Sequence, residues 1–141
     1  MILTAPIDPD ETSLADLLGR YREAVVEAAS DIDPSTLAGE SGLDEASIEA
    51  STSEPIEGIS IEVAAVILGK AEGMPPDTAR ATVRDHLLLA MSGAVMDVEA
   101  LARAVETDVE PGEVQAKVEG RLPMTLEEYA RLLHAIARQG P

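Results

Sequence analysis

The chain contains no phenylalanine and no tryptophan, and Tyr21 and Tyr129 are its only aromatic residues. Because aromatic side chains normally supply much of the buried area of a core, this core must be built from Leu, Ile, Val, Ala and Met. Aliphatic side chains of this kind pack closely between helices more readily than between two sheets. No segment shows the sustained period-two alternation that is typical of a half-buried strand. The sequence therefore predicts an all-α fold, with no sheet beyond an isolated pairing.

The second constraint is charge. The 141 residues include 27 acidic and 10 basic side chains, so the net charge is −17, and Lys70 and Lys117 are the only lysines. A net charge of about 2 to 8 in magnitude is usual for a small domain. Repulsion between carboxylates opposes the compact state in dilute buffer, but about 1 M salt shortens the screening length to about 3 Å. The composition indicates a salt-accumulating cytoplasm; the alternative is an ordinary acidic protein whose charge repels nucleic acid.

Composition also limits the compartment. Hydrophobic residues make up 45% of the chain, which separates it from acidic disordered proteins. No run of 18 apolar residues exists, and the first ten residues lack the basic start of a signal peptide. Without cysteine, disulfides and thiolate metal sites are excluded. We expect a folded cytoplasmic protein without a membrane span.

Capping residues and prolines predict a compact bundle of about eight helices. The expected helix starts are Thr12 or Ser13, Asp33–Pro34, Asp44, Ser60, Pro75–Pro76, Asp97, Pro111 and Thr125. Thr125 and Glu128 have the spacing of a capping box. The stretch after Pro76, which contains Leu87, Leu88 and Leu89, is the most hydrophobic and is expected to form the central helix.

The second half of the sequence resembles the first at an offset close to 65 residues. Asp33 precedes Asp97 by 64 residues (97 − 33), and Ser60 precedes Thr125 by 65 (125 − 60). Apolar positions follow the same offsets. An internal duplication is therefore expected, with two four-helix units that meet through their first helices.

The expected organisation is an extended arm over 1–11, a first helical unit over 12–73 and a second over 74–141. Pro6 and Pro9 favour an extended start. The length fits one compact domain.

Two segments resemble phage-repressor-type helix-turn-helix domains. In 101–137, LARAVETDVEPGEVQAKVEGRLPMTLEEYARLLHAIA, a short Leu-Ala helix precedes a turn and a second helix. Gly120, Pro123 and Thr125 then fall where the family places a glycine and the entry to the next helix. Residues 36–68 resemble the same pattern more loosely. The resemblance implies two tandem helix-turn-helix-like units.

The whole chain also resembles a family of uncharacterised haloarchaeal proteins. The segments RDHLLLAM (84–91) and EGRLPMTLEEYA (119–130) carry this resemblance. It implies a saline habitat and no particular biochemical activity.

The chemistry of the two units departs from the DNA-binding pattern. Recognition helices contact bases and phosphates with Arg, Lys, Asn and Gln. The first unit offers Asp44, Glu45 and Glu49 at that position, followed by Glu54 and Glu57. Facing DNA, this surface would be repelled.

The second unit is less acidic. Residues 100–141 contain seven acidic and five basic residues, net −2, which leaves twenty and five, net −15, for residues 1–99. Basic and amide side chains on or near its predicted recognition helix are the candidate contacts with a partner or with DNA: Arg103, Gln115, Lys117, Arg121 and Arg131. Tyr129 is expected on the same surface, with core packing as the alternative.

No catalytic or metal-binding pattern emerges. His86 and His134 are the only histidines, and neither has a metal-site spacing to a carboxylate. Asp31 and Asp33 begin like a calcium loop, but Gly42 stands where the loop requires glutamate. We expect no enzyme activity, cofactor or metal. The sequence favours a protein-interaction module that binds another protein or a second copy of itself; the alternative is a DNA-binding transcription regulator.

Overall fold

A computed structural model describes residues 1–51, 58–105 and 110–139, and within these ranges the chain is helical with no strand. The elements are η1 (Ile2–Thr4, a 3₁₀ turn), α1 (Leu14–Ser30), α2 (Pro34–Ser41), α3 (Glu45–Ala50), α4 (Ile61–Ala71), α5 (Pro76–Gly93), α6 (Val98–Ala104), α7 (Pro111–Val118) and α8 (Leu126–Gln139). The predicted all-α bundle of about eight helices is confirmed.

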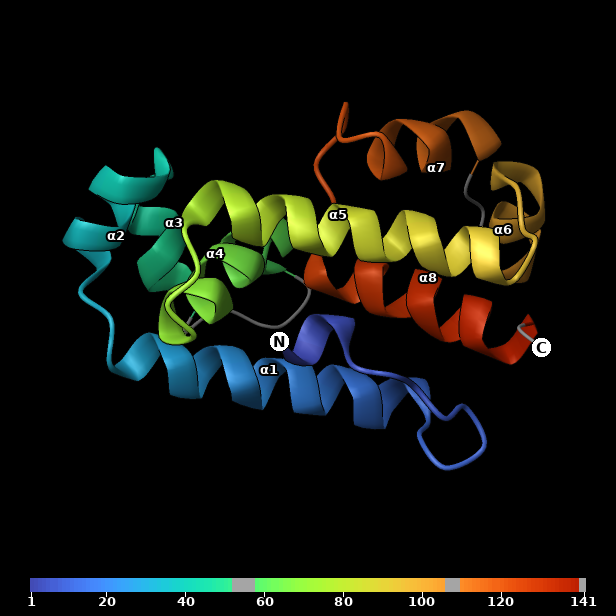
Figure 1. Cartoon of the computed structure of the whole chain (residues 1–141), viewed down its shortest axis with the longest axis horizontal. Helices are drawn as coiled ribbons and strands as arrows, with labels where there is room; N and C mark the ends of the chain where they lie inside the picture. The colour runs from blue at the N-terminus through green and yellow to red at the C-terminus, as the bar shows by residue number, and fades with distance from the viewer. Residues whose placement is uncertain (52–57, 106–109, 140–141) are drawn as a thin grey trace.

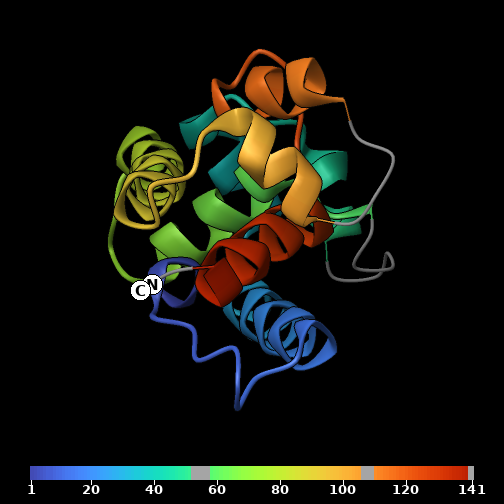
Figure 2. The ribbon, with the colours of Figure 1, turned by 90° about the vertical axis from the view of Figure 1, so that its right-hand side faces the viewer.

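The helices form a bundle with α4 and α8 in its middle (Figure 1). Helix α1 packs against both of them on one side, and α5 packs against both on the other. The short helices pair as α2 with α3 and α6 with α7 at opposite ends of the bundle. Seen from the end, α8 lies between α1 and the pair α6 and α7 (Figure 2).

The central helix is α4, not α5 as expected. All seven residues of Val63–Gly69 are buried. In α5, by contrast, only one face is buried, and Leu88 and Leu89 are 41% and 69% exposed. Successive residues of a helix point about 100° apart, so three adjacent leucines cannot all face one neighbour.

The two halves also meet differently from the prediction. The first helices of the units, α1 and α5, lie on opposite sides of α4 and α8 instead of forming the junction (Figure 1). The last helix of each half therefore supplies the inner layer.

Local capping explains why the helices begin where they do. The side chains of Ser13, Ser60 and Asp97 each accept a hydrogen bond from a backbone N–H of the first turn. Thr125 and Glu128 form the predicted capping box, with reciprocal bonds of 3.0 and 3.1 Å. These four predicted starts are confirmed.

An isolated antiparallel bridge joins Ser60 to Thr125. The N–H of the residue after each donates to the carbonyl of the residue before the other, at 2.9 and 2.7 Å. Ser60 and Thr125 are the two capping residues that lie 65 residues apart. Replacing each residue of one hydrogen bond by the residue 65 positions away in the other half gives the second hydrogen bond.

The N-terminal segment differs from the predicted extended arm. Ile2–Thr4 form a 3₁₀ turn that packs against α1 and α5, and the Leu3 side chain is fully buried. The buried hydroxyl of Tyr129 donates to the Leu3 carbonyl at 2.7 Å. The turn lies before the two prolines and is stabilised by burial of Leu3 and by the bond from Tyr129. Ala5, which precedes Pro6, is extended as the proline favours, with φ −72° and ψ 147°.

Candidate functional site

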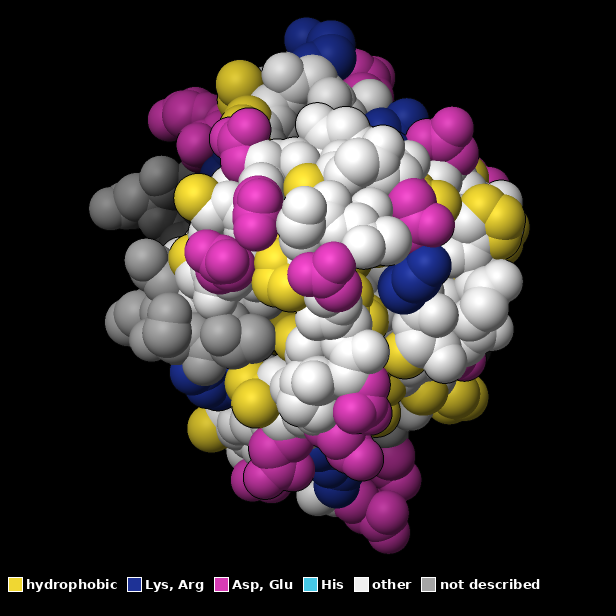
Figure 3. Space-filling model, turned by 90° about the vertical axis from the view of Figure 1, so that its left-hand side faces the viewer, with side chains coloured by type: hydrophobic (Ala, Val, Ile, Leu, Met, Phe, Trp, Pro, Cys, Tyr) yellow, Lys and Arg dark blue, Asp and Glu magenta, His cyan; other side chains and the backbone are white. Residues whose placement is uncertain are grey.

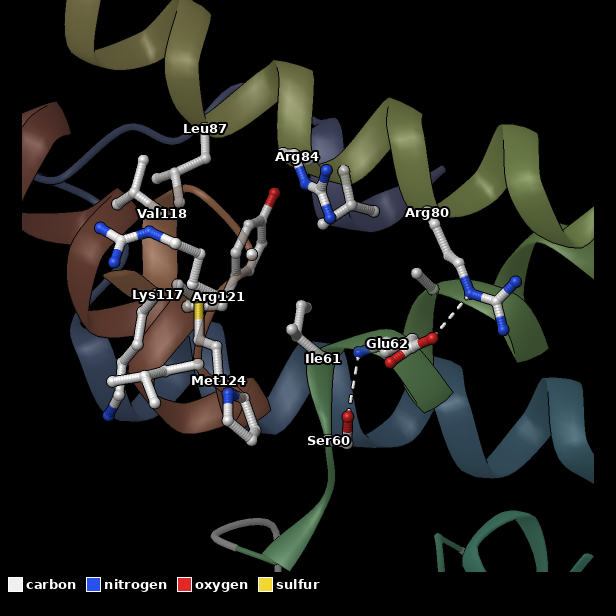
Figure 4. Close-up of a pocket in the computed structure, with 16 residues that line it drawn as sticks. Ser60, Ile61, Glu62, Arg80, Arg84, Leu87, Lys117, Val118, Arg121 and Met124 are labelled. Carbon is white, nitrogen blue, oxygen red and sulfur yellow. Dashed lines mark hydrogen bonds and ion pairs between the residues drawn. The ribbon is translucent and has the colours of Figure 1, made fainter. Parts of the chain in front are cut away.

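A pocket of about 490 Å³ lies between the start of α4, the middle of α5 and the segment that joins α7 to α8 (Figure 4). Its charged lining residues are Arg80, Arg84, Lys117, Arg121 and Glu62. Apolar side chains supply much of the remaining wall: Ile61, Ala65, Val83, Leu87, Val118, Leu122 and Met124. The bridge between Ser60 and Thr125 places α4 beside this segment, so the pocket sits where the two halves meet.

Arg80 is held by the protein itself. Its guanidinium pairs with Glu62 at 2.8 Å and with Asp77 at 2.9 Å, and it also donates to the carbonyl of Ser41. The dashed line to Glu62 in Figure 4 marks the first of these contacts. Arg80 therefore joins α5 to α4 and to the end of α2.

Lys117 is held in the same way. Its side chain is only 15% exposed, and its ammonium pairs with Glu128 and, at 3.5 Å, with Glu113. Burial disfavours the charged ammonium, but the hydrogen bonds and attraction of these carboxylates outweigh it and raise the pKa of Lys117. Burial likewise opposes the charge of Glu128, and the bonds from Lys117 and Thr125 outweigh it and lower the pKa of Glu128.

Glu119 binds Gln115 and Arg121, the two other predicted contact residues on α7 and just after it. Gln115 donates to it at 3.2 Å, and Arg121 pairs with it at 2.7 Å. The hydrogen bonds from Gln115 and from Arg121 lower the pKa of the Glu119 carboxyl. Both predicted readers are therefore bonded within the chain, although the Arg121 side chain remains 62% exposed.

Arg84 is different. It projects from α5 toward the pocket in Figure 4, and no hydrogen bond or ion pair of its side chain is found within residues 1–51, 58–105 and 110–139. Its guanidinium lies against Gly120: a Cβ at that glycine would stand 2.5 Å from Nη2. Gly120 has φ +81°, so glycine both ends α7 and leaves room for the guanidinium.

Arg103 and Arg131 do not line this pocket, whereas Tyr129 lines it from the core. Arg103 is exposed on α6, and Arg131 pairs with Glu127 on α8 at 2.7 Å. Tyr129 is 1% exposed, so its expected place on a partner surface is wrong. Its ring packs 6.3 Å from that of Tyr21, where both fill a core that has no other aromatic residue.

A family model matches residues 17–139 of the chain. The chain belongs to the Family of unknown function (DUF5791). No curated protein matches it, and no solved structure matches it. The family assignment agrees with the expected resemblance to uncharacterised proteins and adds no activity.

The end of α5 exposes apolar side chains that were expected in the core. We call Leu88 and Leu89 on α5, together with Val95 two residues after its end, the α5 apolar surface; they are 41%, 69% and 91% exposed. Val95 has φ +55°, the left-handed region that β-branched residues rarely adopt. The run of three leucines pointed to a core helix, and only their angular positions on the helix could have separated Leu87 from its two neighbours.

On the face in Figure 3, Asp and Glu side chains outnumber Lys and Arg, with apolar atoms visible between them. Glu54 and Glu57, which were expected to extend the acidic surface of the first unit, lie outside the described residues, as do 106–109.

The histidines occupy separate places. His86 is partly buried on α5, and burial lowers its pKa. The ring Nε2 of His134 lies 2.9 Å from the carbonyl oxygen of Thr12. In the described part of the chain, no three His, Asp or Glu side chains are grouped closely enough to hold a metal ion, and no helix there could cross a membrane.

Proposed function

We propose that the chain is a non-catalytic binding protein that docks another protein through the α5 apolar surface. The observation that supports this most directly is Val95. The residue that follows a helix in the left-handed conformation is usually glycine, because a side chain there is strained. Here it is a valine whose side chain is 91% exposed and therefore has little internal packing to offset the strain.

The strain is substantial on the scale of protein stability. A non-glycine residue in this backbone region costs about 1–3 kcal/mol. The turn itself is a regular one, since the N–H of Met96 bonds back to the carbonyl of Met91 at 2.9 Å and closes the last turn of α5. Glycine would adopt that turn with less strain. A partner protein that covers Val95 together with Leu89 would account for the valine.

Charge supports a protein partner over DNA. The net charge is −17, and the expected readers Gln115, Lys117 and Arg121 each bond a carboxylate of the same chain. Binding to phosphates would require these pairs to break, and concentrated salt reduces the gain from counterion release.

The test compares matched exposed apolar residues. Leu89→Ser and Val95→Gly alter the α5 apolar surface, whereas Val26→Ser alters a 36% exposed valine on α1, across the bundle. Tagged protein is purified from native extract in about 1 M KCl, and sedimentation equilibrium measures self-association separately. We expect the first two variants to lose a partner that the Val26→Ser variant keeps. Equal recovery with all three variants would contradict the proposal.

A DNA-binding assay distinguishes this proposal from the alternative, a transcription regulator. Retardation of duplex DNA in about 1 M KCl that disappears in an Arg121→Glu variant would favour a transcription regulator instead. No retardation is expected.

We also propose that the two halves are a diverged duplication of one helix-turn-helix-like four-helix unit. Support comes from the order of a long helix, two short helices and a closing helix in each half, and from the bridge whose hydrogen bonds exchange under the 65-residue offset. Superposing α1–α4 on α5–α8 tests this. A rotation close to a half-turn about the bridge is expected, and any other transformation would contradict it.

Finally, we propose that the protein works in the concentrated salt of a halophile cytoplasm. The support is its 27 acidic residues against 2 lysines.

A further inference from the structure

We propose that the pocket between α4, α5 and the α7–α8 segment binds a small carboxylate with an aliphatic body, and that Arg84 is its charge partner. This site is separate from the α5 apolar surface and does not depend on protein docking.

Basic side chains are concentrated at this pocket. The chain has 10 basic residues among 27 acidic ones, yet four of the ten line this pocket. Glu62 is the only acidic residue in its wall. Carboxylates of the chain pair with Arg80, Lys117 and Arg121, so the positive charge that the pocket offers to an anion is that of Arg84.

The four basic side chains differ in whether a carboxylate of the chain already binds them. Arg80 is bonded to Glu62 and Asp77, Lys117 to Glu113 and Glu128, and Arg121 to Glu119. Within the described part of the chain, Arg84 has no such partner. An arginine without a carboxylate partner in so acidic a protein leaves one guanidinium fork free for an external acceptor.

The chemistry of a guanidinium favours a carboxylate as the group that binds Arg84. A guanidinium binds a planar carboxylate through two parallel hydrogen bonds. One uncommitted positive charge balances a monoanion, whereas a phosphate dianion would need a second free cation. The carboxylate is therefore favoured, and phosphate is the competing oxyanion.

The apolar wall determines the rest of the ligand. Val83, Leu87, Val118 and Met124 line the same cavity, whose volume of about 490 Å³ is in the usual range for small-molecule sites. Each methylene buried against such a wall strengthens binding about fourfold. An aliphatic body of several carbons attached to the carboxylate fits both parts of the pocket.

Arg84 has one competing explanation. Its guanidinium lies beside Gly120 at the end of α7, where a positive charge also stabilises the helix dipole. A purely structural role would make Arg84 matter for stability and leave ligand binding unaffected.

The experiment is an NMR titration of the full chain in about 2 M KCl, where long-range repulsion is screened. The probes are hexanoate, acetate, hexyl phosphate and hexanol. We expect hexanoate to shift the amide signals of Leu87, Gly120 and Met124, with acetate at least about tenfold weaker and hexanol weaker than hexanoate. Arg84→Gln should weaken hexanoate binding about tenfold or more, and Arg84→Lys should restore part of it. Arg103→Gln, which removes an exposed arginine on α6, should leave it unchanged.

Tighter binding of hexyl phosphate that still requires Arg84 keeps the site but assigns it to phosphate esters. If none of the probes binds, or if Arg84→Gln lowers stability without changing hexanoate affinity, the proposal is overturned and the helix-end explanation stands.

Discussion

Val95 is the residue whose conformation and surroundings disagree most. It combines φ +55° with an almost fully exposed β-branched side chain. Its neighbours in sequence pack against the core as Ala94 and Met96, so the strain is confined to one residue. This confinement makes its energetic effect measurable by substitution.

Val95→Gly should raise the free energy of unfolding by about 1 kcal/mol, because relief of strain exceeds the added flexibility of glycine in the unfolded chain. Chemical denaturation of the free protein measures this. Val95→Ala is the control, since alanine keeps the left-handed strain and should give no comparable gain. A loss of stability with glycine would show that the exposed side chain packs favourably after all.

Glu128 stabilises the fold through its charge. Because its pKa in the fold is lower than the ordinary value of 4.5, its contribution is present above that pH and is lost as the pH falls through the lower folded value. Glu128→Gln removes one of the two carboxylate partners of Lys117 and should lower the free energy of unfolding at pH 7 by about 1–2 kcal/mol. The stability of the variant should also fall less steeply than that of the original protein as the pH falls below 4.5. Parallel curves for the variant and the original protein would rule out this role.

At the scale of the element, helix boundaries follow local side-chain chemistry. Thr125→Ala removes one half of the capping box of α8 and should lower the free energy of unfolding by about 1 kcal/mol. Thermal or urea unfolding measures the change. Thr125→Ser retains the hydroxyl and should behave like the original protein. An alanine variant of unchanged stability would mean that the box does not stabilise α8.

The contrast between α4 and α5 gives a second prediction for the elements. Ile67 on α4 is fully buried, whereas Leu88 on α5 is 41% exposed. Ile67→Ala should therefore lower the free energy of unfolding by about 2–5 kcal/mol, and Leu88→Ala by less than about 1 kcal/mol. Urea unfolding measures both changes. Similar losses of unfolding free energy in the two variants would contradict the central position of α4.

At the scale of the molecule, the net charge of −17 acts on the compact state as a whole. Ion pairs in the described residues include those of Lys70, Arg80, Lys117, Arg121 and Arg131. Ten basic side chains cannot balance 27 carboxylates, so most of the acidic charge has no counterpart in the chain. Their repulsion is long-ranged in dilute buffer and short-ranged in molar salt.

We expect the melting temperature to be higher by about 10 °C or more in molar KCl than in dilute buffer. Sucrose at matched osmolality is the control, because it does not screen charge. Scanning calorimetry in the three solutions makes the measurement. Equally high melting temperatures throughout would contradict the proposed saline habitat.

The candidate site was only partly predictable. Lys117 and Arg121 were selected because they lie near the predicted recognition helix, and both do line the pocket. Arg80 and Arg84 were missed because they lie on another helix about 35 residues earlier, and no local pattern links that helix to the α7–α8 segment. The ion pair between Lys117 and Glu128, which occupies the lysine, likewise joins two helices and has no sequence signal.

The helical class and most helix starts follow from the sequence, because aliphatic composition, capping residues and prolines act within a few residues of where they stand. Ser60, Asp97 and Thr125 all began helices where expected. The tertiary structure alone decided that α4 is central, that Leu3 is buried and that Arg84 faces a pocket. These depend on which helix faces pair across the bundle, and pairing is set by the total burial of many distant residues at once.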